Sequence, residues 1–307
     1  MLTPQRHFID LHAPAAVHGR TRRMAYQEWP AQAGADPRRV VVCVHGLTRQ
    51  ARDFDALAQV LQAQARVLAV DVAGRGDSDW LADPMGYQVP TYATDLAVLL
   101  QQIRREQPDA LIDWVGTSMG GLIGMALAAQ PESGLRRLVL NDVGPVIQWE
   151  ALQRIGSYVG RDPVFDTEQQ AVDYLSSILT GFGPHTPDQW WALSRPMLRS
   201  RGTRWGLHYD PAIATPFKVL LDMPDQAAAR EALRQGEAIW WRVYDAITAP
   251  TLLLRGAESD LLTRDTAHAM TQRGPRAQCL EFAHIGHAPT LVADDQTAAV
   301  AAFLAAA

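Results

Sequence analysis

The sequence predicts an α/β protein whose mostly parallel sheet carries helices on both faces and receives an inserted helical cap. Three observations support this fold class. Short apolar runs rich in β-branched residues alternate with amphipathic segments of helical length, which is typical of a parallel sheet buried on both faces. A serine flanked by glycines lies where one such run passes into a helical segment. Residues 146–245, by contrast, show helical patterns with few strand-like runs.

The first half of the chain supplies most of the predicted sheet. Two short strand patterns, at 7–11 and 23–29, open the chain, and a turn around residues 18–19 joins them into an antiparallel hairpin. The continuous apolar runs that follow predict buried parallel strands at 40–44, 66–70, 111–115 and 135–140. Segments of helical pattern between these runs predict helices at 53–64, 92–105 and 122–129.

The predicted core consists of residues 1–145 and 246–307, and residues 146–245 form the predicted cap. Six of the nine tryptophans of the chain fall in the cap: Trp149, Trp190, Trp191, Trp205, Trp240 and Trp241. These rings either line an apolar acyl pocket or pack the cap onto the core, and for any single tryptophan packing is the favoured interpretation. After the cap, the pattern predicts strands at 251–254 and 277–282 and helices at 263–273 and 295–307.

The stretch 113–121, DWVGTSMGG, is the centre of the functional prediction. Its segment GTSMG, residues 116–120, matches the G-x-S-x-G nucleophile elbow at a strand-to-helix turn. The serine backbone must adopt a strained conformation to raise its Oγ above the sheet edge. Glycines two residues to either side avoid a Cβ clash where strand and helix cross closely. The helix N-terminus then points amide donors at charge that develops near Ser118.

A serine hydroxyl is a weak nucleophile at neutral pH, so it needs a base, and the base needs a third group to fix its tautomer. We predict Ser118 as the nucleophile, Asp260 as the acid and His287 as the base. Each follows a predicted strand at the sheet edge where loops gather, in the chain order Ser, acid, His. Asp142, which follows the strand at 135–140, is the principal alternative for the acid.

Beyond the elbow, further motifs span nearly the whole chain: HGLT at 45–48, DVAGRGDSD at 71–79, LVLNDVG at 138–144, RGAESD at 255–260 and GHAP at 286–289. Together with GTSMGG at 116–121 they resemble the α/β-hydrolase superfamily, in its cap-bearing branch of serine esterases, lactonases and C–C-bond hydrolases. The resemblance implies an eight-stranded, mostly parallel sheet. It also implies an oxyanion hole formed by the backbone amides of Leu47 and Met119. A serine at the elbow disfavours dehalogenase and epoxide hydrolase chemistry, which needs a carboxylate nucleophile.

The resulting hypothesis is a serine hydrolase that cleaves a carboxylic ester of a small to medium, largely apolar acyl compound through an acyl-enzyme. It requires no cofactor and no metal, and its expected partner is the small-molecule acyl substrate. A lactonase or C–C-bond hydrolase on the same triad is one alternative. A non-catalytic small-molecule receptor with this fold is the other.

Weaker assignments complete the predicted site. The candidate substrate contacts are His45, Arg49, Trp149, His185, Trp205 and Trp240, with Arg75 and His208 as further candidates for a polar substrate group. His45 is also interpreted as a structural histidine that shapes its loop. Glu258 is a weaker alternative acid, and His284 is an alternative base that lacks the preceding glycine. The aspartates of the 71–79 motif are expected to hold their loop rather than bind a metal.

Composition excludes several other functions. The 307 residues carry a formal net charge of −5, with no basic patch of the kind that nucleic acid or anionic lipid requires. The N-terminus lacks the apolar core of a signal peptide, and no apolar run approaches membrane-spanning length. The two cysteines, Cys43 and Cys279, lie in apolar strand patterns and are predicted to be buried, which favours a reducing, cytoplasmic location.

Overall fold

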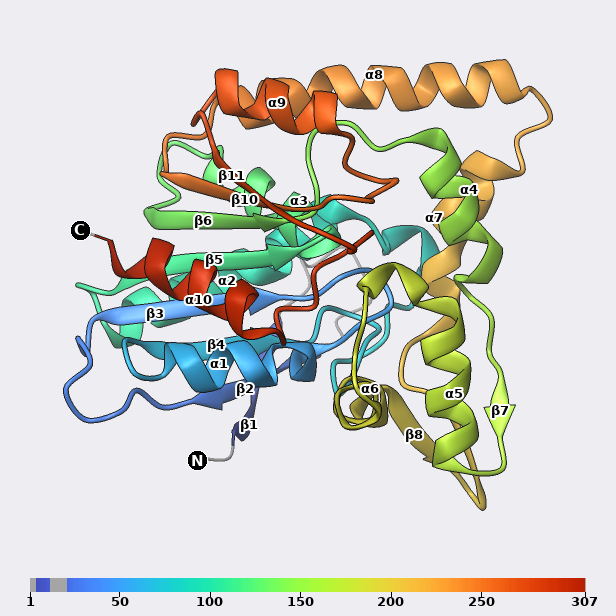
Figure 1. Ribbon diagram of the computed structural model, residues 1–307, viewed down its shortest axis with the longest axis horizontal. Coiled ribbons are helices and arrows are strands. Elements are labelled where there is room, and N and C mark those ends of the chain that lie inside the picture. The colour runs from blue at the N-terminus through green and yellow to red at the C-terminus, as the bar shows by residue number, and fades with distance from the viewer. Residues whose placement is uncertain (1–3, 12–20, 307) are drawn as a thin grey trace.

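The computed structural model describes residues 4–11 and 21–306, and its centre is an eight-stranded sheet (Figure 1). The strands lie in the order β1-β2-β4-β3-β5-β6-β10-β11. Their bounds are β1 Gln5–Leu11, β2 Arg22–Trp29, β3 Arg39–Val44, β4 Arg66–Val70, β5 Leu111–Thr117, β6 Leu135–Asn141, β10 Thr251–Gly256 and β11 Gln278–Phe282. β2 pairs antiparallel with β1 and β4, and all other neighbours are parallel. The predicted sheet is therefore confirmed, while the predicted turn at 18–19 lies outside the described residues.

Alternate residues of the central strand β3 face two separate apolar layers, which explains its continuous apolar run. Val40, Val42 and Val44 pack into one layer, and Val41 and Cys43 pack into the other. The first layer contains side chains of α2 Val89–Glu106, α3 Met119–Ala128 and α9 Arg264–Gln272. The second contains side chains of α1 Asp55–Leu61 and α10 Asp294–Ala305 (Figure 1). Helices thus cover both faces of the sheet, as predicted.

The segment between β6 and β10 contains helices and, contrary to the sequence pattern, a second sheet. Its helices are α4 Trp149–Tyr158, α5 Glu168–Ile178, α6 Pro187–Ser194, α7 Thr215–Leu221 and α8 Gln226–Asp245. The sheet has the order β7-β9-β8, with bounds Val164–Phe165, Arg204–Leu207 and Leu198–Arg201. These strands are two to four residues long, too short to show a period, and Gly202 forms the turn between β8 and β9 with φ of 70°.

Short 3-10 turns complete the described chain. They are η1 Ala51–Phe54, η2 Pro84–Gly86, η3 Thr180–Phe182, η4 Arg195–Met197 and η5 Pro211–Ala214. The last helix of the inserted segment, α8, extends back along the core beside α9 (Figure 1). Its Tyr244 is fully buried and donates a hydrogen bond to the carbonyl oxygen of Met270 at 2.7 Å. α8 therefore anchors the inserted segment to the core.

The two cysteines have different surroundings. Cys43 is fully buried, as predicted, but the prediction for Cys279 is wrong, because its side chain is exposed. Cys279 lies on β11, the last strand of the sheet, where most side chains lack a covering layer. Among the described residues, no helix combines the length and the apolar character needed to cross a bilayer.

Candidate active site

Ser118 occupies the turn between β5 and α3, at the carboxyl edge of the parallel strands. Its φ of 51° and ψ of −115° are the strained backbone conformation that the elbow motif predicts. A Cβ on Gly116 would overlap the carbonyl of Gly120, and a Cβ on Gly120 would overlap the carbonyl oxygen of Val44. Only glycine at both positions lets α3 cross this closely over β3 and β5.

His287 lies in the loop after β11 and reaches Ser118. Its Nε2 is 2.9 Å from Ser118 Oγ, within hydrogen-bonding distance. The alternative base, His284, is 86% exposed at its side chain and lies 3.8 Å from Glu258, another exposed group. The structure therefore brings His287, and not His284, to the serine.

The carboxylate that meets His287 is Asp142, and this corrects the predicted position of the acid. The Nδ1 of His287 donates to Oδ2 of Asp142 at 2.7 Å. Asp260 instead forms a two-armed ion pair with Arg154 of α4, with Nε–Oδ2 and Nη2–Oδ1 distances of 2.6 and 2.8 Å, and its side chain is 45% exposed. The physical reason is strand order: β6 is the direct neighbour of β5, so the residue after β6 lies beside the elbow.

Asp142 is fully buried, yet donors surround its carboxylate. Its Oδ1 accepts from the backbone amide of Gly256 at 2.9 Å, and its Oδ2 accepts from Ser259 Oγ at 2.6 Å as well as from His287. Hydrogen bonds of this kind stabilise a buried negative charge. Ser259 was not foreseen, although it directly precedes Asp260 in the RGAESD motif. The loop after β10 thus supplies a donor to the carboxylate rather than the carboxylate itself.

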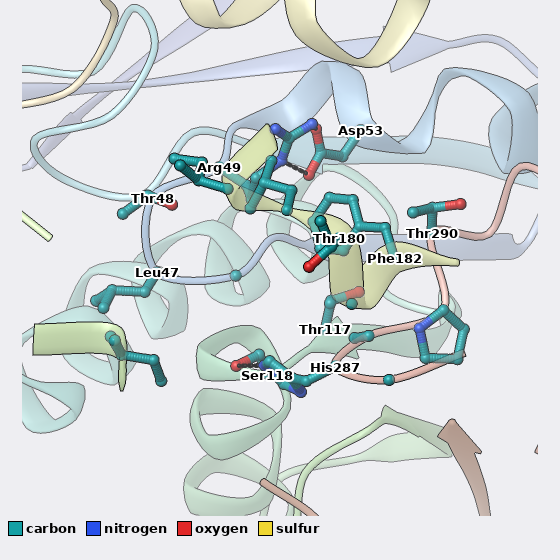
Figure 2. A pocket seen from close by; sticks show the side chains of 18 of the residues that line it. Leu47, Thr48, Arg49, Asp53, Thr117, Ser118, Thr180, Phe182, His287 and Thr290 are labelled. Carbon is teal, nitrogen blue, oxygen red and sulfur yellow. Dashed lines mark hydrogen bonds and ion pairs between the residues drawn. The ribbon is translucent and has the colours of Figure 1, made fainter. Parts of the chain in front are cut away.

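The predicted oxyanion donors, Leu47 and Met119, belong to two segments that adjoin Ser118. Leu47 is in the loop after β3, where no strand uses its amide, and Met119 is the first residue of α3, where the helix leaves its amide free. A Cβ added to Gly46 would be in ordinary contact with the Cβ of Ser118, at 3.6 Å. The HGLT loop therefore lies directly against Ser118 (Figure 2).

A cavity of about 330 Å³ extends from Ser118 between the core and the inserted segment (Figure 2). Its apolar wall residues from the inserted segment are Ile155, Tyr158, Ile178, Leu179, Phe182 and Leu193. Arg154, Thr180 and Gly181 of the same segment complete this wall. Its polar wall groups include Thr48, Thr180, Thr290 and the ion pair of Arg49 with Asp53. This size and mixed lining are typical of a small-molecule site.

Comparison with known proteins agrees with this fold. Residues 35–288 match the Hydrolase_4 family, described as serine aminopeptidase, S33. The chain belongs to this family of α/β hydrolases. It is 45% identical to the 3-hydroxybutyrate-oligomer hydrolase of Cupriavidus necator over 300 residues, 96% of each chain. Similar solved structures are a putative hydrolase from Rickettsia typhi (26% identity, TM-score 0.82, 98% of each chain) and an α/β hydrolase from Novosphingobium aromaticivorans (33% identity, TM-score 0.79, 99% of each chain).

Most of the predicted substrate contacts of this α/β hydrolase lie outside the cavity. Arg49 lines it, whereas His185 lies behind the wall, where its Nε2 is hydrogen-bonded to Oγ1 of Thr290 at 2.8 Å. The three tryptophans proposed as contacts serve packing instead. Trp149 is buried beneath Arg230, Trp205 lies beneath Arg195, and Trp240 packs against the core cluster. The packing interpretation therefore holds for them, and aliphatic side chains with Phe182 and Tyr158 line the cavity.

His45 shapes the loop of the HGLT motif from within the core. It is fully buried, its Nε2 accepts a hydrogen bond from the amide of Val72 at 3.0 Å, and its Nδ1 donates to the carbonyl of Gly46 at 2.7 Å. Burial lowers the pKa of the His45 imidazole to about 3. A neutral histidine with both nitrogens occupied is a structural group, as in the second interpretation of this residue, and does not contact substrate.

Two aspartates of the 71–79 motif, Asp71 and Asp79, hold their loop, as predicted, while Asp77 forms an ion pair with Arg6. Asp71 is buried and accepts from the amides of Ala51 at 2.8 Å and Asp77 at 3.0 Å, and burial raises its pKa to about 7. Asp79 accepts from the amide of Arg23 at 2.7 Å. Within the described part of the chain, histidines, cysteines and carboxylates do not gather in threes as metal ligands would.

Proposed function

We propose that this protein hydrolyses carboxylic esters through an acyl-enzyme formed on Ser118. The observation that supports this most directly is the continuous hydrogen-bonded chain from Ser118 Oγ through His287 to the buried Asp142. A serine, a histidine and a carboxylate in this order provide a nucleophile, a base and a group that fixes the tautomer of the base. The esterase and oligomer-hydrolase names of the relatives agree with this chemistry.

The mechanism follows from the positions of these atoms. Ser118 Oγ attacks the ester carbonyl while Nε2 of His287 takes its proton, and Asp142 stabilises the imidazolium that forms. The amides of Leu47 and Met119 donate to the tetrahedral oxyanion. His287 then protonates the leaving alcohol, and the acyl group remains on Ser118. In the second half-reaction His287 removes a proton from water, which attacks the acyl-enzyme and releases the acid and the free serine.

For the substrate class we propose short oligoesters of hydroxy acids. The 45% identical relative is named for 3-hydroxybutyrate oligomers. An oligoester chain alternates apolar carbons with ester oxygens, and the cavity likewise combines an apolar wall with the hydroxyls of Thr48, Thr180 and Thr290. Arg49 is the one predicted substrate contact that lines this cavity, beside Asp53. The inserted segment supplies most of the apolar wall and acts in this proposal as a cap over the substrate.

The test compares turnover of a 3-hydroxybutyrate dimer and of a p-nitrophenyl ester chain-length series. We expect wild type to hydrolyse both and Ser118→Ala to lose at least about a thousandfold in kcat, since the serine is the nucleophile. Ser133→Ala, in the loop between α3 and β6 and outside the residues that line the cavity, is the matched control and should keep full activity. Turnover of lactones or vinylogous diketones without ester turnover would contradict the ester assignment. Binding without any turnover would favour a receptor.

The expected compartment is a reducing one. Both cysteines are free, and Cys279 is exposed, which an oxidising compartment would not favour. A cytoplasmic location follows from this reasoning and is tested by fractionation of cells that express the untagged protein.

A further inference from the structure

Arg75 places a guanidinium between the loop and the helix start that hold the proposed oxyanion donors, Leu47 and Met119. Its side chain is fully buried. Nε donates to the carbonyl oxygen of Leu47 at 2.8 Å, and Nη2 lies 3.6 Å from the sulfur of Met119. One side chain thus contacts both residues whose amides are the proposed oxyanion donors. Since it is buried and its donors point to protein groups, Arg75 does not serve as the direct substrate contact considered from the sequence.

The charge of Arg75 has no carboxylate partner among the described residues. Its Nη1 donates to the carbonyl of Ala73 at 2.7 Å and to the hydroxyl of Tyr92 at 2.8 Å. The rings of Tyr92 and Tyr87 lie 5.0 and 5.6 Å from its central carbon. The guanidinium is thus bound by neutral hydrogen-bond acceptors and aromatic rings, which do not neutralise its charge. Burial of a cation without a counter-ion destabilises the folded protein. We therefore attribute the presence of Arg75 to a role in activity rather than in stability.

The backbone around Arg75 also connects the inserted segment to this loop. Arg75 forms an isolated antiparallel bridge with Tyr209, the amide of Gly76 donates to the carbonyl of His208 at 3.0 Å, and the amide of Asp210 donates to that of Gly74 at 2.7 Å. These contacts hold the Arg75 backbone on both sides. The side chain of Arg75 therefore extends toward Leu47 and Met119 from a backbone whose position is fixed.

We propose that Arg75 is a positioning residue for the oxyanion hole, an inference that rests on the proposed serine hydrolase function. Its charge-assisted hydrogen bond to Leu47 fixes the HGLT loop, and its contact with Met119 fixes the start of α3, so both amides keep the distance that a tetrahedral oxyanion needs. Its uncompensated charge adds to the positive potential in which the oxyanion forms. Arg75 therefore stabilises the transition state and the tetrahedral intermediate, which carry the oxyanion, and not the bound substrate.

The experiment measures Arg75→Met and Arg75→Lys by two readouts: kcat and KM for p-nitrophenyl butyrate, and the rate at which a fluorophosphonate labels Ser118. In the labelling step Ser118 Oγ bonds to phosphorus, fluoride leaves, and His287 takes the proton, while the phosphoryl oxygen occupies the oxyanion hole. For Arg75→Met we expect kcat and the labelling rate to fall about a hundredfold, with KM within about threefold of wild type. Arg75→Lys keeps the charge without the planar fork, so we expect a smaller loss of about tenfold.

Arg39→Met is the matched control, because Arg39 is another largely buried arginine but lies at the opposite end of β3, paired with Asp113. It should lower Tm without changing kcat or labelling. A folded Arg75→Met variant with wild-type kcat and labelling rate would overturn the inference while leaving the proposed function intact. Absence of Ser118 labelling in wild type would overturn both.

If Arg75→Met does not fold, the variants Arg75→Lys and Tyr92→Phe test the positioning role of Arg75 instead. Tyr92→Phe removes the hydroxyl that holds Nη1 and keeps the ring. We expect both folded variants to lose kcat at nearly constant KM. Wild-type kcat in both would refute a positioning role.

Discussion

His287 Nδ1 lies 2.7 Å from Oδ2 of Asp142, although 145 residues separate the two in the chain. The contact forms because β6 lies beside β5, so that Asp142 and Ser118, each of which directly follows one of these strands, are brought close together. Asp142 adopts φ of 56°, a conformation that non-glycine residues rarely take, and its carboxylate is held by Gly256 and Ser259. Strained residues of this kind concentrate at functional sites, and here both Ser118 and Asp142 are among them.

Replacement of each candidate acid in turn by asparagine gives a direct test of this geometry. We expect Asp142→Asn to lower kcat about a thousandfold or more, since it removes the charge that fixes the histidine tautomer and stabilises the imidazolium. Asp260→Asn should change kcat by less than about threefold, because Asp260 pairs with Arg154 at the exposed rim of the cavity. Steady-state kinetics on one ester measures both. A larger loss of kcat in Asp260→Asn than in Asp142→Asn would identify Asp260 as the catalytic acid.

Two glycines should respond in opposite ways to alanine. In Gly120→Ala the new methyl group would overlap the carbonyl oxygen of Val44, so we expect a loss of about 3 kcal/mol or more in the free energy of unfolding. Gly236 lies within α8 with no atom near its missing Cβ, so Gly236→Ala should gain about 0.5–1 kcal/mol from helix propensity. Urea unfolding measures both values. Equal stability of the two variants would show that α3 does not cross β3 this closely.

The buried His45 predicts a loss of stability in mild acid. Its folded-state pKa of about 3 is below the ordinary value of 6.5, so below pH 6.5 the unfolded chain binds a proton that the folded protein does not. The contribution of His45 is therefore fully present above pH 6.5 and is lost as the pH falls toward 3, by about 2 kcal/mol at pH 5. Urea unfolding at pH 7 and pH 5 measures it. His45→Gln, which cannot ionise, should show a smaller drop, and an equal drop would assign the effect to other groups.

The acyl pocket can be resized at Phe182. Its ring lines the cavity, stacks at 6.2 Å on Trp190 and lies 5.5 Å from the guanidinium of Arg49. Phe182→Ala should move the preferred acyl chain length upward and raise KM for the shortest esters several-fold, because their contact area falls. Trp205→Ala is the control, since Trp205 packs under Arg195 away from the cavity, and it should keep the wild-type preference. An unchanged preference in Phe182→Ala would place the acyl chain elsewhere.

The parts of the site that depend on local backbone geometry could be predicted from the sequence. Gly116 and Gly120 are needed wherever a strand and a helix cross this closely, so their spacing around Ser118 identified the elbow. His287 follows the last strand of the sheet, where the parallel strands direct their loops to one edge. The sequence prediction placed Asp260 rather than Asp142 beside His287, because both aspartates follow predicted strands. Their local patterns are equivalent, and only the order of β5, β6 and β10 separates them.

The sequence by itself determined the fold class, the strand-to-helix elbow at Ser118 and the apolar layers on both faces of the sheet, because these depend on short-range patterns of apolar residues and glycines. Only the tertiary structure decided which carboxylate meets the base, which side chains line the cavity and that Arg75 contacts Leu47 and Met119, 28 and 44 residues away. The tertiary structure also placed Trp149, Trp205 and Trp240 in packing positions and left Cys279 exposed on an edge strand. The physical reason is that these contacts depend on how separate elements pack together, and no periodicity within one segment records the identity of its neighbours.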